Sequence, residues 1–231
     1  METFRHYLQM SLLIMSLRLA WKDRENFFVA GNMFMYYSQL QARKNDFRGP
    51  DVFVVLDTDK HKDRKSWVVW EEDGKTPDVI IELTSPTTVA VDRGEKMRIY
   101  ARLLRVAEYY LFDPYTAELE GYRLDPIRAE YQPIQPDEQG RLACDRLGLM
   151  LGVVPGEFQD YQVDWLRWLD REGKVLPHGE ELAEAEAQRA EAEARRAEAE
   201  AQRAEAEAQR VQELAAKLAQ YEQKFGALND K

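Results

Sequence analysis

Two carboxylates stand at the ends of two predicted buried strands. Asp51 directly precedes the apolar run 52–56, and Glu82 closes the apolar run 79–81. Short runs of apolar and β-branched residues bounded by Pro and Gly are typical of buried strands. A charge at the end of such a strand needs a compensating partner. Together with Lys96, which follows Glu82 on a predicted helix, these two acids would suit a divalent metal ion and a phosphate.

Each of these residues also has a structural interpretation. Asp51 and Asp78 both follow a proline, where a carboxylate can cap a strand or a turn. Glu82 could be an ordinary charge at a strand end. Lys96 could pair with Asp92 on a solvated helix face, because the two are four residues apart. The residues alone leave these alternatives open.

A helix is predicted over residues 91–104, between the strand that ends at Glu82 and a strand over 109–112. Its apolar stripe comprises Met97, Tyr100, Ala101 and Leu104, so that Tyr100 has a packing role as well as a possible supporting role at the site. The hydroxyls of the sequence 85–88 can cap this helix. A strand, a strand, a helix and a strand in this order predict an α/β fold in which the helix is a crossover connection.

The remaining elements are predicted from periodicity. Apolar residues at helical spacing predict an opening helix, with a stripe of Phe4, Leu8, Leu12, Met15 and Leu19. Further strands are expected at 119–124 and 131–134. The segments 27–37 and 67–70 are ambiguous, the first between strand and helix and the second between strand and apolar loop.

Composition and charge limit the classes of function. The net charge is −10, of which the 13 acids and 8 bases of residues 180–231 contribute half. A protein that binds nucleic acid through a broad basic face usually has the opposite sign, whereas a metal ion would supply local positive charge. One cysteine, Cys144, excludes an intrachain disulfide framework. With no run of about 20 apolar residues for a membrane span and no clear signal peptide, a cytoplasmic protein is expected.

A heptad repeat occupies the end of the chain. Units of the type Ala-Glu-Ala-Glu-Ala-Gln-Arg begin at Ala183 and continue to Arg210, without Gly or Pro between Glu180 and Phe225. These residues favour one long helix, and the continuous alanine seam has coiled-coil spacing. An exposed single helix, a coiled coil between subunits and a helix that docks on a partner protein all remain open. The segment 173–179 is predicted to be a linker, which gives domains at 1–176 and 177–231.

The whole pattern resembles the Uma-two family of bacterial proteins. The residues that carry the resemblance are 49–55, 77–88, Asp92, Lys96, Tyr100 and 108–114, in this order. The family is assigned to the PD-(D/E)XK restriction-endonuclease-like superfamily. The resemblance therefore implies a mixed sheet flanked by helices, with Asp51 as the first acid and Glu82 as the second. The lysine that the superfamily has two residues after the second acid is here Thr84, and Lys96 is its substitute.

The resemblance implies a Mg²⁺- or Mn²⁺-dependent endonuclease that hydrolyses DNA phosphodiester bonds. Asp51 and Glu82 would hold the metal, Asp51, Glu82 and Lys96 would be catalytic, and Asp78 and Tyr100 would support them. A lysine beside the metal can orient or deprotonate a bound water, with its pKa depressed by burial and by the neighbouring cation. The expected partners are DNA, a second copy in a homodimer, and a protein bound by the tail. The alternative is a nuclease fold without activity that serves as a binding or assembly module through its tail.

Overall fold

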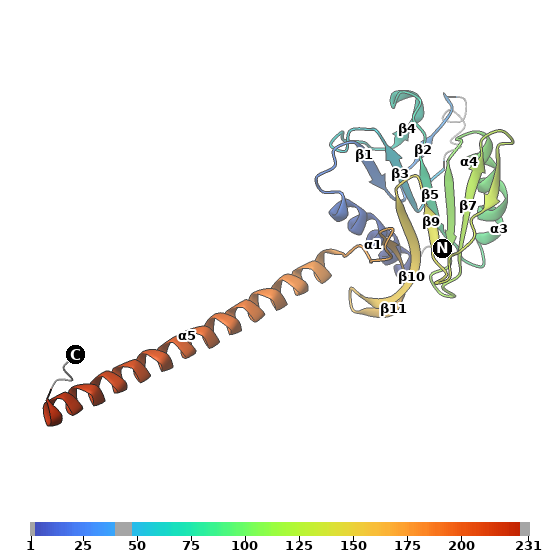
Figure 1. The fold of residues 1–231 in the computed structure, drawn as a ribbon. Helices are drawn as coiled ribbons and strands as arrows, with labels where there is room; N and C mark the ends of the chain where they lie inside the picture. Colours follow the sequence, from blue (N-terminus) through green and yellow to red (C-terminus); the bar gives the residue numbers. More distant parts are fainter. Residues whose placement is uncertain (1–2, 40–47, 227–231) are drawn as a thin grey trace. The chain divides into compact units, whose positions relative to one another are not determined.

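The computed structural model describes residues 3–39 and 48–226, and it divides into two units, Met1–Gly179 and Glu180–Lys231. The first unit is built around a six-stranded mixed sheet (Figure 1). Its strands, in spatial order, are β1 (Phe27–Ala30), β3 (Val52–Leu56), β5 (Val79–Leu83), β6 (Glu108–Phe112), β7 (Leu119–Asp125) and β8 (Glu130–Pro133). All neighbours are antiparallel except β5 and β6. The predicted mixed α/β architecture is therefore confirmed.

The connection between the parallel strands β5 and β6 is helical, as the sequence predicts. It comprises α3 (Val89–Val91), the wider π-helical turn η2 (Asp92–Lys96) and α4 (Met97–Arg102). Ile99, Tyr100 and Leu104 pack on the sheet face that carries Phe53, Ile80 and Tyr109. A short parallel pair, β2 (Met35–Tyr36) and β4 (Trp67–Val68), supplies Met35 and Trp67 to the same core, and the 3-10 turn η1 (Val69–Glu71) follows.

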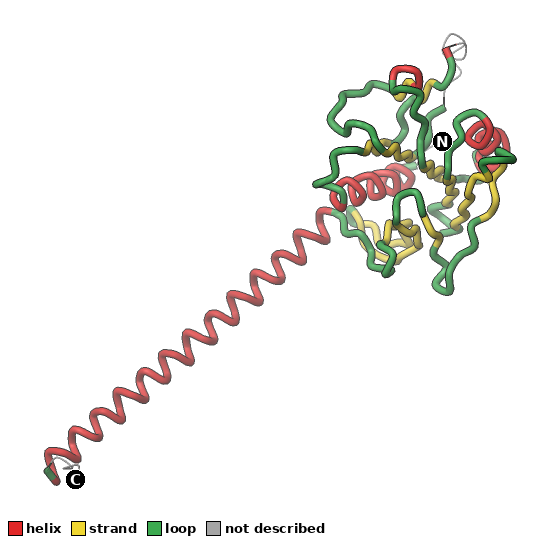
Figure 2. Tube along the Cα trace, turned by 45° about the horizontal axis from the view of Figure 1, so that its top comes forward, coloured by secondary structure: helices red, strands yellow, loops and turns green. Residues whose placement is uncertain are grey.

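The opposite face of the sheet is covered by the opening helix α1 (Phe4–Ala20) and by a second sheet. That sheet consists of β9 (Leu142–Cys144), β10 (Leu149–Phe158) and β11 (Tyr161–Leu169), in the order β11-β10-β9. Its strands were not predicted. Figure 2 shows the same trace with the helices in red, the strands in yellow and the loops in green.

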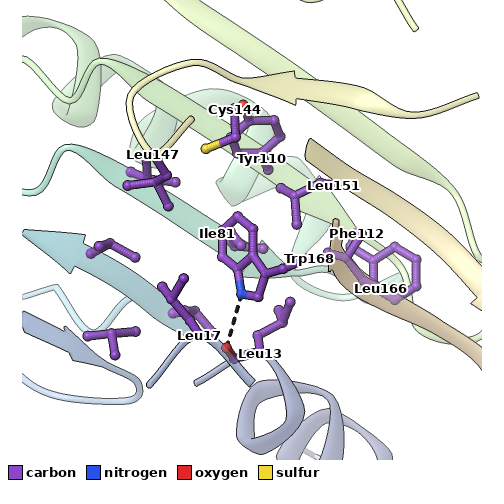
Figure 3. Packing of buried hydrophobic residues seen from close by; sticks show 14 of the residues in the cluster. Leu13, Leu17, Ile81, Tyr110, Phe112, Cys144, Leu147, Leu151, Leu166 and Trp168 are labelled. Atoms are coloured by element: carbon purple, nitrogen blue, oxygen red, sulfur yellow. Dashed lines mark hydrogen bonds between the residues drawn. The ribbon is translucent and has the colours of Figure 1, made fainter. Parts of the chain in front are cut away.

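Trp168 belongs to the apolar core that lies between the central sheet, α1 and the second sheet. Its indole packs among residues of both sheets, and its Nε1–H donates to the carbonyl oxygen of Leu13 at 3.0 Å (Figure 3). Gln9 forms the other link between α1 and β11. Its buried amide donates to the carbonyl oxygen of Leu166 and accepts from the Leu166 N–H, both at 2.9 Å. Because buried backbone groups need partners, this side chain fixes the position of α1 along β11.

The predicted apolar stripe of α1 is partly wrong. Leu8 and Leu12 are buried, but Phe4 and Met15 are more than half exposed. The buried face is instead His6, Leu8, Gln9, Leu12, Leu13, Ser16 and Leu17. Periodicity missed it because three of these residues are polar and satisfy their hydrogen bonds inside the protein, such as Ser16 with the Leu12 carbonyl.

The predicted linker at 173–179 is packed against the first unit. Val175 forms a bridge with Leu169, the Leu176 N–H donates to the Trp168 carbonyl at 2.9 Å, and His178 is buried against Phe158. The ordered domain thus continues beyond the predicted boundary at residue 176. The second unit is the helix α5 (Gly179–Phe225), as the heptad composition predicts, and residues 227–231 lie outside the described residues. None of the described helices is long and apolar enough to cross a membrane.

Deleting residues 180–231 is expected to leave the first unit folded, because its buried apolar residues lie between Leu8 and Leu176. The melting temperature and the urea midpoint should match those of the full chain. A control that ends at Gly173 also loses Leu176 and His178, and it should be less stable by about 2 kcal/mol or more, the usual effect of losing a buried leucine side chain. Loss of cooperative unfolding in the first truncation would contradict this expectation.

Candidate active site

Asp51 and Glu82 face each other across two neighbouring strands. Val52 pairs with Ile81 in the antiparallel register of β3 and β5, so Asp51 and Glu82 occupy the next positions. Because side chains alternate along a strand, both lie on the face that also carries Phe53 and Ile80. The Asp51 N–H lies 3.4 Å from Glu82 Oε2, and Asp51 Oδ2 accepts from the Leu83 N–H at 2.6 Å.

Lys96 reaches the same place from η2. Its Nζ lies 3.0 Å from Glu82 Oε2 and 2.9 Å from Asp92 Oδ1. The structure therefore brings Asp51, Glu82 and Lys96 together, as the sequence predicts, while their catalytic roles stay predictions. The pairing of Lys96 with Asp92 also exists, but the Asp92 side chain is buried rather than on a solvated face.

Asp92 and Lys96 are the first and last residues of the π-helical turn η2. Such turns are rare and often occur at functional sites. Here the Tyr109 hydroxyl donates to the Asp92 carbonyl oxygen at 3.0 Å, which gives this carbonyl a partner outside the helix. Gly94, in the middle of the turn, faces open space, because a Cβ atom at this position would meet nothing within 4 Å. Sequence periodicity treats this stretch as regular helix and so misses the turn.

Tyr100 packs in the core as predicted and also contacts Glu82, while its supporting role in catalysis stays a prediction. Its ring is buried in the core between α4 and the sheet, and its hydroxyl donates to Glu82 Oε1 at 2.8 Å. Burial and the nearby Glu82 carboxylate hold the pKa of Tyr100 well above its usual range. Tyr100 is therefore a neutral hydrogen-bond donor that orients Glu82.

Three carboxylates and one ammonium group meet at this site, and the ammonium group contacts two of the carboxylates, those of Glu82 and Asp92. Burial raises the pKa of Glu82 to about 8, and the negative charges of Asp51 and Asp92 add to the effect of burial against the opposing effect of Lys96. Burial lowers the pKa of Lys96, but the carboxylates of Glu82 and Asp92 outweigh it and raise this pKa above its usual value. Lys96 is thus charged at neutral pH, and Glu82 is the carboxylate that takes up a proton to relieve the excess negative charge.

A cavity of about 150 Å³ opens beside these side chains. It is lined by His6, Gly49, Asp51, Leu83, Ser85, Thr88, Asp92 and Lys96. Sequence analysis missed His6 and Asp92 as site residues. The spacing of four residues between Asp92 and Lys96 could have indicated Asp92. His6 lines the cavity only because Gln9 and Trp168 hold α1 over the end of β5, which the sequence does not show. His6 Nδ1 lies 2.8 Å from Thr3 Oγ1, and its Nε2 lies 3.3 Å from the Thr84 carbonyl oxygen.

Asp78 does not belong to this cluster. It lies at the other end of β5, where its Oδ2 accepts from the Leu56 N–H at 2.7 Å and its Oδ1 binds Arg146. Its contacts are those of a strand cap. Thr84 is buried at the end of β5, two residues after Glu82, and its N–H donates to the Phe112 carbonyl oxygen at 2.8 Å.

The donor set fits a hard divalent cation bound by few protein ligands. Among residues 3–39 and 48–226, no group of three or more His, Cys, Asp and Glu side chains is arranged as a metal site. Mg²⁺ commonly binds one or two carboxylates and completes its shell with water and phosphate oxygens. Asp51 and Glu82 supply two carboxylates. A divalent cation would also neutralise the excess negative charge around Lys96.

The raised pKa of Glu82 predicts how the stability of the metal-free protein depends on pH. In the folded state Glu82 keeps its proton up to a pH of about 8, whereas the unfolded chain loses it near its ordinary value. Its contribution to stability is therefore fully present below about pH 4.5 and is lost as the pH rises to about 8. The loss is of order 1 kcal/mol per pH unit across this range.

Glu82→Gln removes this titration while keeping an oxygen acceptor for Tyr100. The difference in unfolding free energy between the parent and the variant, measured with urea in EDTA, should change steadily between about pH 4.5 and 8 in favour of the variant. A parallel pH dependence of the two proteins would contradict the raised pKa of Glu82.

Comparison with known proteins identifies the family of the chain. The family model of Uma2, described as "Putative restriction endonuclease", matches residues 1–152, which include Asp51, Glu82, Asp92 and Lys96. No curated protein matches the chain. A crystal structure described as that of "a putative nuclease belonging to DUF820" from Anabaena variabilis is similar to it with 14% identity and a TM-score of 0.43, over 71% of this chain and 79% of that chain. Since the family model spans well over half of the sequence, the chain belongs to the Uma2 family of restriction-endonuclease-like proteins.

Proposed function

We propose that the protein is a metal-dependent endonuclease that hydrolyses DNA phosphodiester bonds at the cavity beside Asp51. The observation that carries this proposal is the convergence of Asp51, Asp92 and Lys96 at one cavity wall, with the buried Glu82 carboxylate in contact with Lys96. Membership of a family of restriction-endonuclease-like proteins supports DNA as the substrate. A cluster of three acids and one lysine in which Glu82 and Asp92 are fully buried is costly for a purely structural element, which also favours a functional role.

Asp51 and Glu82 are the residues that would hold Mg²⁺ or Mn²⁺. When bound, such an ion lowers the pKa of a coordinated water and neutralises charge that develops on the phosphate. Tyr100 and the Leu83 N–H keep the two carboxylates oriented toward each other. Asp92 holds the Lys96 ammonium in place from the other side.

Lys96 acts as a fixed positive charge rather than as a base. Its raised pKa keeps the ammonium protonated at neutral pH, in contrast to the depressed pKa that the sequence analysis considered. A protonated lysine can donate hydrogen bonds to the attacking water or to a phosphate oxygen, and it stabilises negative charge in a water-poor site. Proton removal then belongs to another group, and the substrate phosphate and bulk water are the available acceptors.

The tail is proposed to pair two copies of the chain. Val211, Leu214, Leu218 and Tyr221 are exposed on α5 and follow one another at alternating spacings of three and four residues. This is the pattern that buries one apolar stripe against another in a coiled coil. The upstream seam consists of alanine, which buries little surface, so we expect a weak homodimer.

Asp51→Asn tests the metal-binding role. The asparagine oxygen can still accept from the Leu83 N–H, while the repulsion between Asp51 and Glu82 disappears. We expect the melting temperature in EDTA to stay the same or rise, and the increase on adding Mg²⁺ to disappear. A loss of about 1 kcal/mol or more in EDTA would assign Asp51 a structural role only.

Asp78→Asn is the matched control, because it also follows a proline and also caps a neighbouring strand. It weakens the contact with Arg146, so we expect a lower melting temperature in EDTA but an unchanged response to Mg²⁺. If the two variants lose the Mg²⁺ response equally, the metal site lies elsewhere.

Lys96→Met tests the role of the ammonium. Since lysine does not ligate the cation, Mg²⁺-dependent cleavage of plasmid DNA should fall by about a hundredfold or more, while stabilisation by Mg²⁺ persists. Adding Thr84→Lys places an ammonium on the same strand face as Glu82 and should restore part of the cleavage. Cleavage by Lys96→Met at the parent rate removes Lys96 from the mechanism. Absence of cleavage by the parent with any divalent metal favours the inactive binding module.

A further inference from the structure

The first turn of α1 carries a group of exposed aromatic side chains. Phe4 and Tyr7 are 57% and 56% exposed, with ring centroids 6.0 Å apart, and Tyr161 on β11 is 44% exposed with its ring 5.8 Å from that of Phe4. Tyr115, in the turn between β6 and β7, is 55% exposed. Large aromatic residues are normally the side chains that folding buries. We call these four residues the aromatic patch.

One member of the aromatic patch lies beside the candidate active site. The Tyr115 hydroxyl donates to Thr3 Oγ1 at 2.8 Å, and its ring lies 6.0 Å from that of His6. His6 is buried and lines the cavity with Asp51 and Lys96. Phe4 and Tyr7 belong to the same helical turn as His6, so the aromatic patch and the cavity are both built on the first turn of α1.

Arg5 adds a positive charge beside the aromatic patch. Its guanidinium lies over the Tyr115 ring, 5.0 Å from the centroid. Within the part of the chain that the structure describes, its Nε is buried without a hydrogen-bond partner, and no ion pair of Arg5 is found among these residues. Arg5 as a whole is only partly buried, so its guanidinium offers a positive charge that no carboxylate among residues 3–39 and 48–226 neutralises. An anion such as a phosphate has the required charge and oxygens.

We propose that the aromatic patch and Arg5 bind an unpaired DNA strand, so that the substrate of the cavity is single-stranded DNA or a frayed duplex end. Bases would stack on Phe4, Tyr7 and Tyr161, and a backbone phosphate would bind Arg5. Exposed rings suit this ligand because every base offers a flat face, whereas paired bases keep their faces inside the duplex. The net charge of the chain is −10, so base stacking must supply most of the affinity and Arg5 the local positive charge. The proposal deepens the proposed function and rests on it for the choice of DNA.

Binding of labelled oligothymidylate to the full chain, measured by fluorescence anisotropy in EDTA, tests the proposal without requiring catalysis. The parent should bind the single strand at least tenfold more tightly than a blunt duplex of equal length. The double variant Phe4→Ala and Tyr7→Ala should lose about tenfold or more in single-strand affinity, and Phe4→Trp should keep it. The control Trp70→Ala removes an exposed aromatic residue of η1 and should bind like the parent.

Arg5→Gln has a separate readout that a structural role would not change. Loss of one phosphate contact should reduce the slope of log affinity against log salt concentration by about 0.7, the value for one phosphate of a single strand. An unchanged slope overturns the role of Arg5. Equal affinity for single strand and duplex, parent-like binding by the double alanine variant, or equal weakening by Trp70→Ala overturns the proposal.

Failure of this proposal can be separated from failure of the proposed function. Mg²⁺-dependent cleavage without a preference for unpaired strands overturns the aromatic patch as a binding site but leaves the nuclease intact. Single-strand binding in EDTA without cleavage supports the patch and overturns the nuclease. If Phe4→Ala and Tyr7→Ala instead abolish self-association in the absence of DNA, the patch is an interface between copies of the chain and the proposal is overturned.

Discussion

The structure depends on a charged cluster held inside an apolar face of a sheet. Glu82 is fully buried in β5, with Phe53, Ile80 and Tyr109 on the same face. Such a position is tolerated because Lys96, Tyr100 and the register of β3 against β5 supply partners for its carboxylate. Removing Lys96 would leave the buried Asp92 carboxylate without its cation, which costs far more than a surface pair contributes. The crossover helices must therefore be positioned so that Lys96 and Tyr100 contact this carboxylate.

The second sheet has an indirect effect on the same cluster. It shares no residue with the cavity lining, yet β11 positions α1 through Gln9 and through the Trp168 hydrogen bond. That positioning places His6 at the cavity and the aromatic patch beside it. The site thus combines two parts of different origin, a charged wall from the central sheet and its crossover, and a polar and aromatic rim from the start of the chain.

The sequence predicts the central elements because their patterns are local. Continuous apolar runs identify β3 and β5, the stripe at Met97, Tyr100 and Ala101 identifies α4, and a strict register then brings Asp51 opposite Glu82. The strands β10 and β11 were missed because their burial depends on partners far away in the sequence. Leu166 and Trp168, for example, contact Gln9 and Leu13, which no window of neighbouring residues can show. His6 was missed for the same reason, since a lone histidine reveals its neighbours only after α1 is placed.

Asp92 shows a different limit of prediction from the sequence. Its spacing from Lys96 was visible, but a pair four residues apart on a helix is usually a solvated pair. Only the wide turn at η2, combined with the Tyr109 hydroxyl on the Asp92 carbonyl, directs both side chains inward. Departures from regular geometry of this kind depend on tertiary contacts.

The contact between Trp168 and Leu13 also constrains the order in which the chain can fold during synthesis. The two residues are 155 positions apart, and Gln9 and Leu166 are separated by 157. Contacts at such separation are slow to form because the intervening loop must be closed first. During translation the central strands emerge long before β11. Until β11 is made, the apolar side chains on one face of the central sheet are only partly covered, and they can bind chaperones or aggregate. The residues of α5 are synthesised after β11, and this gives the domain time to close while they are being added.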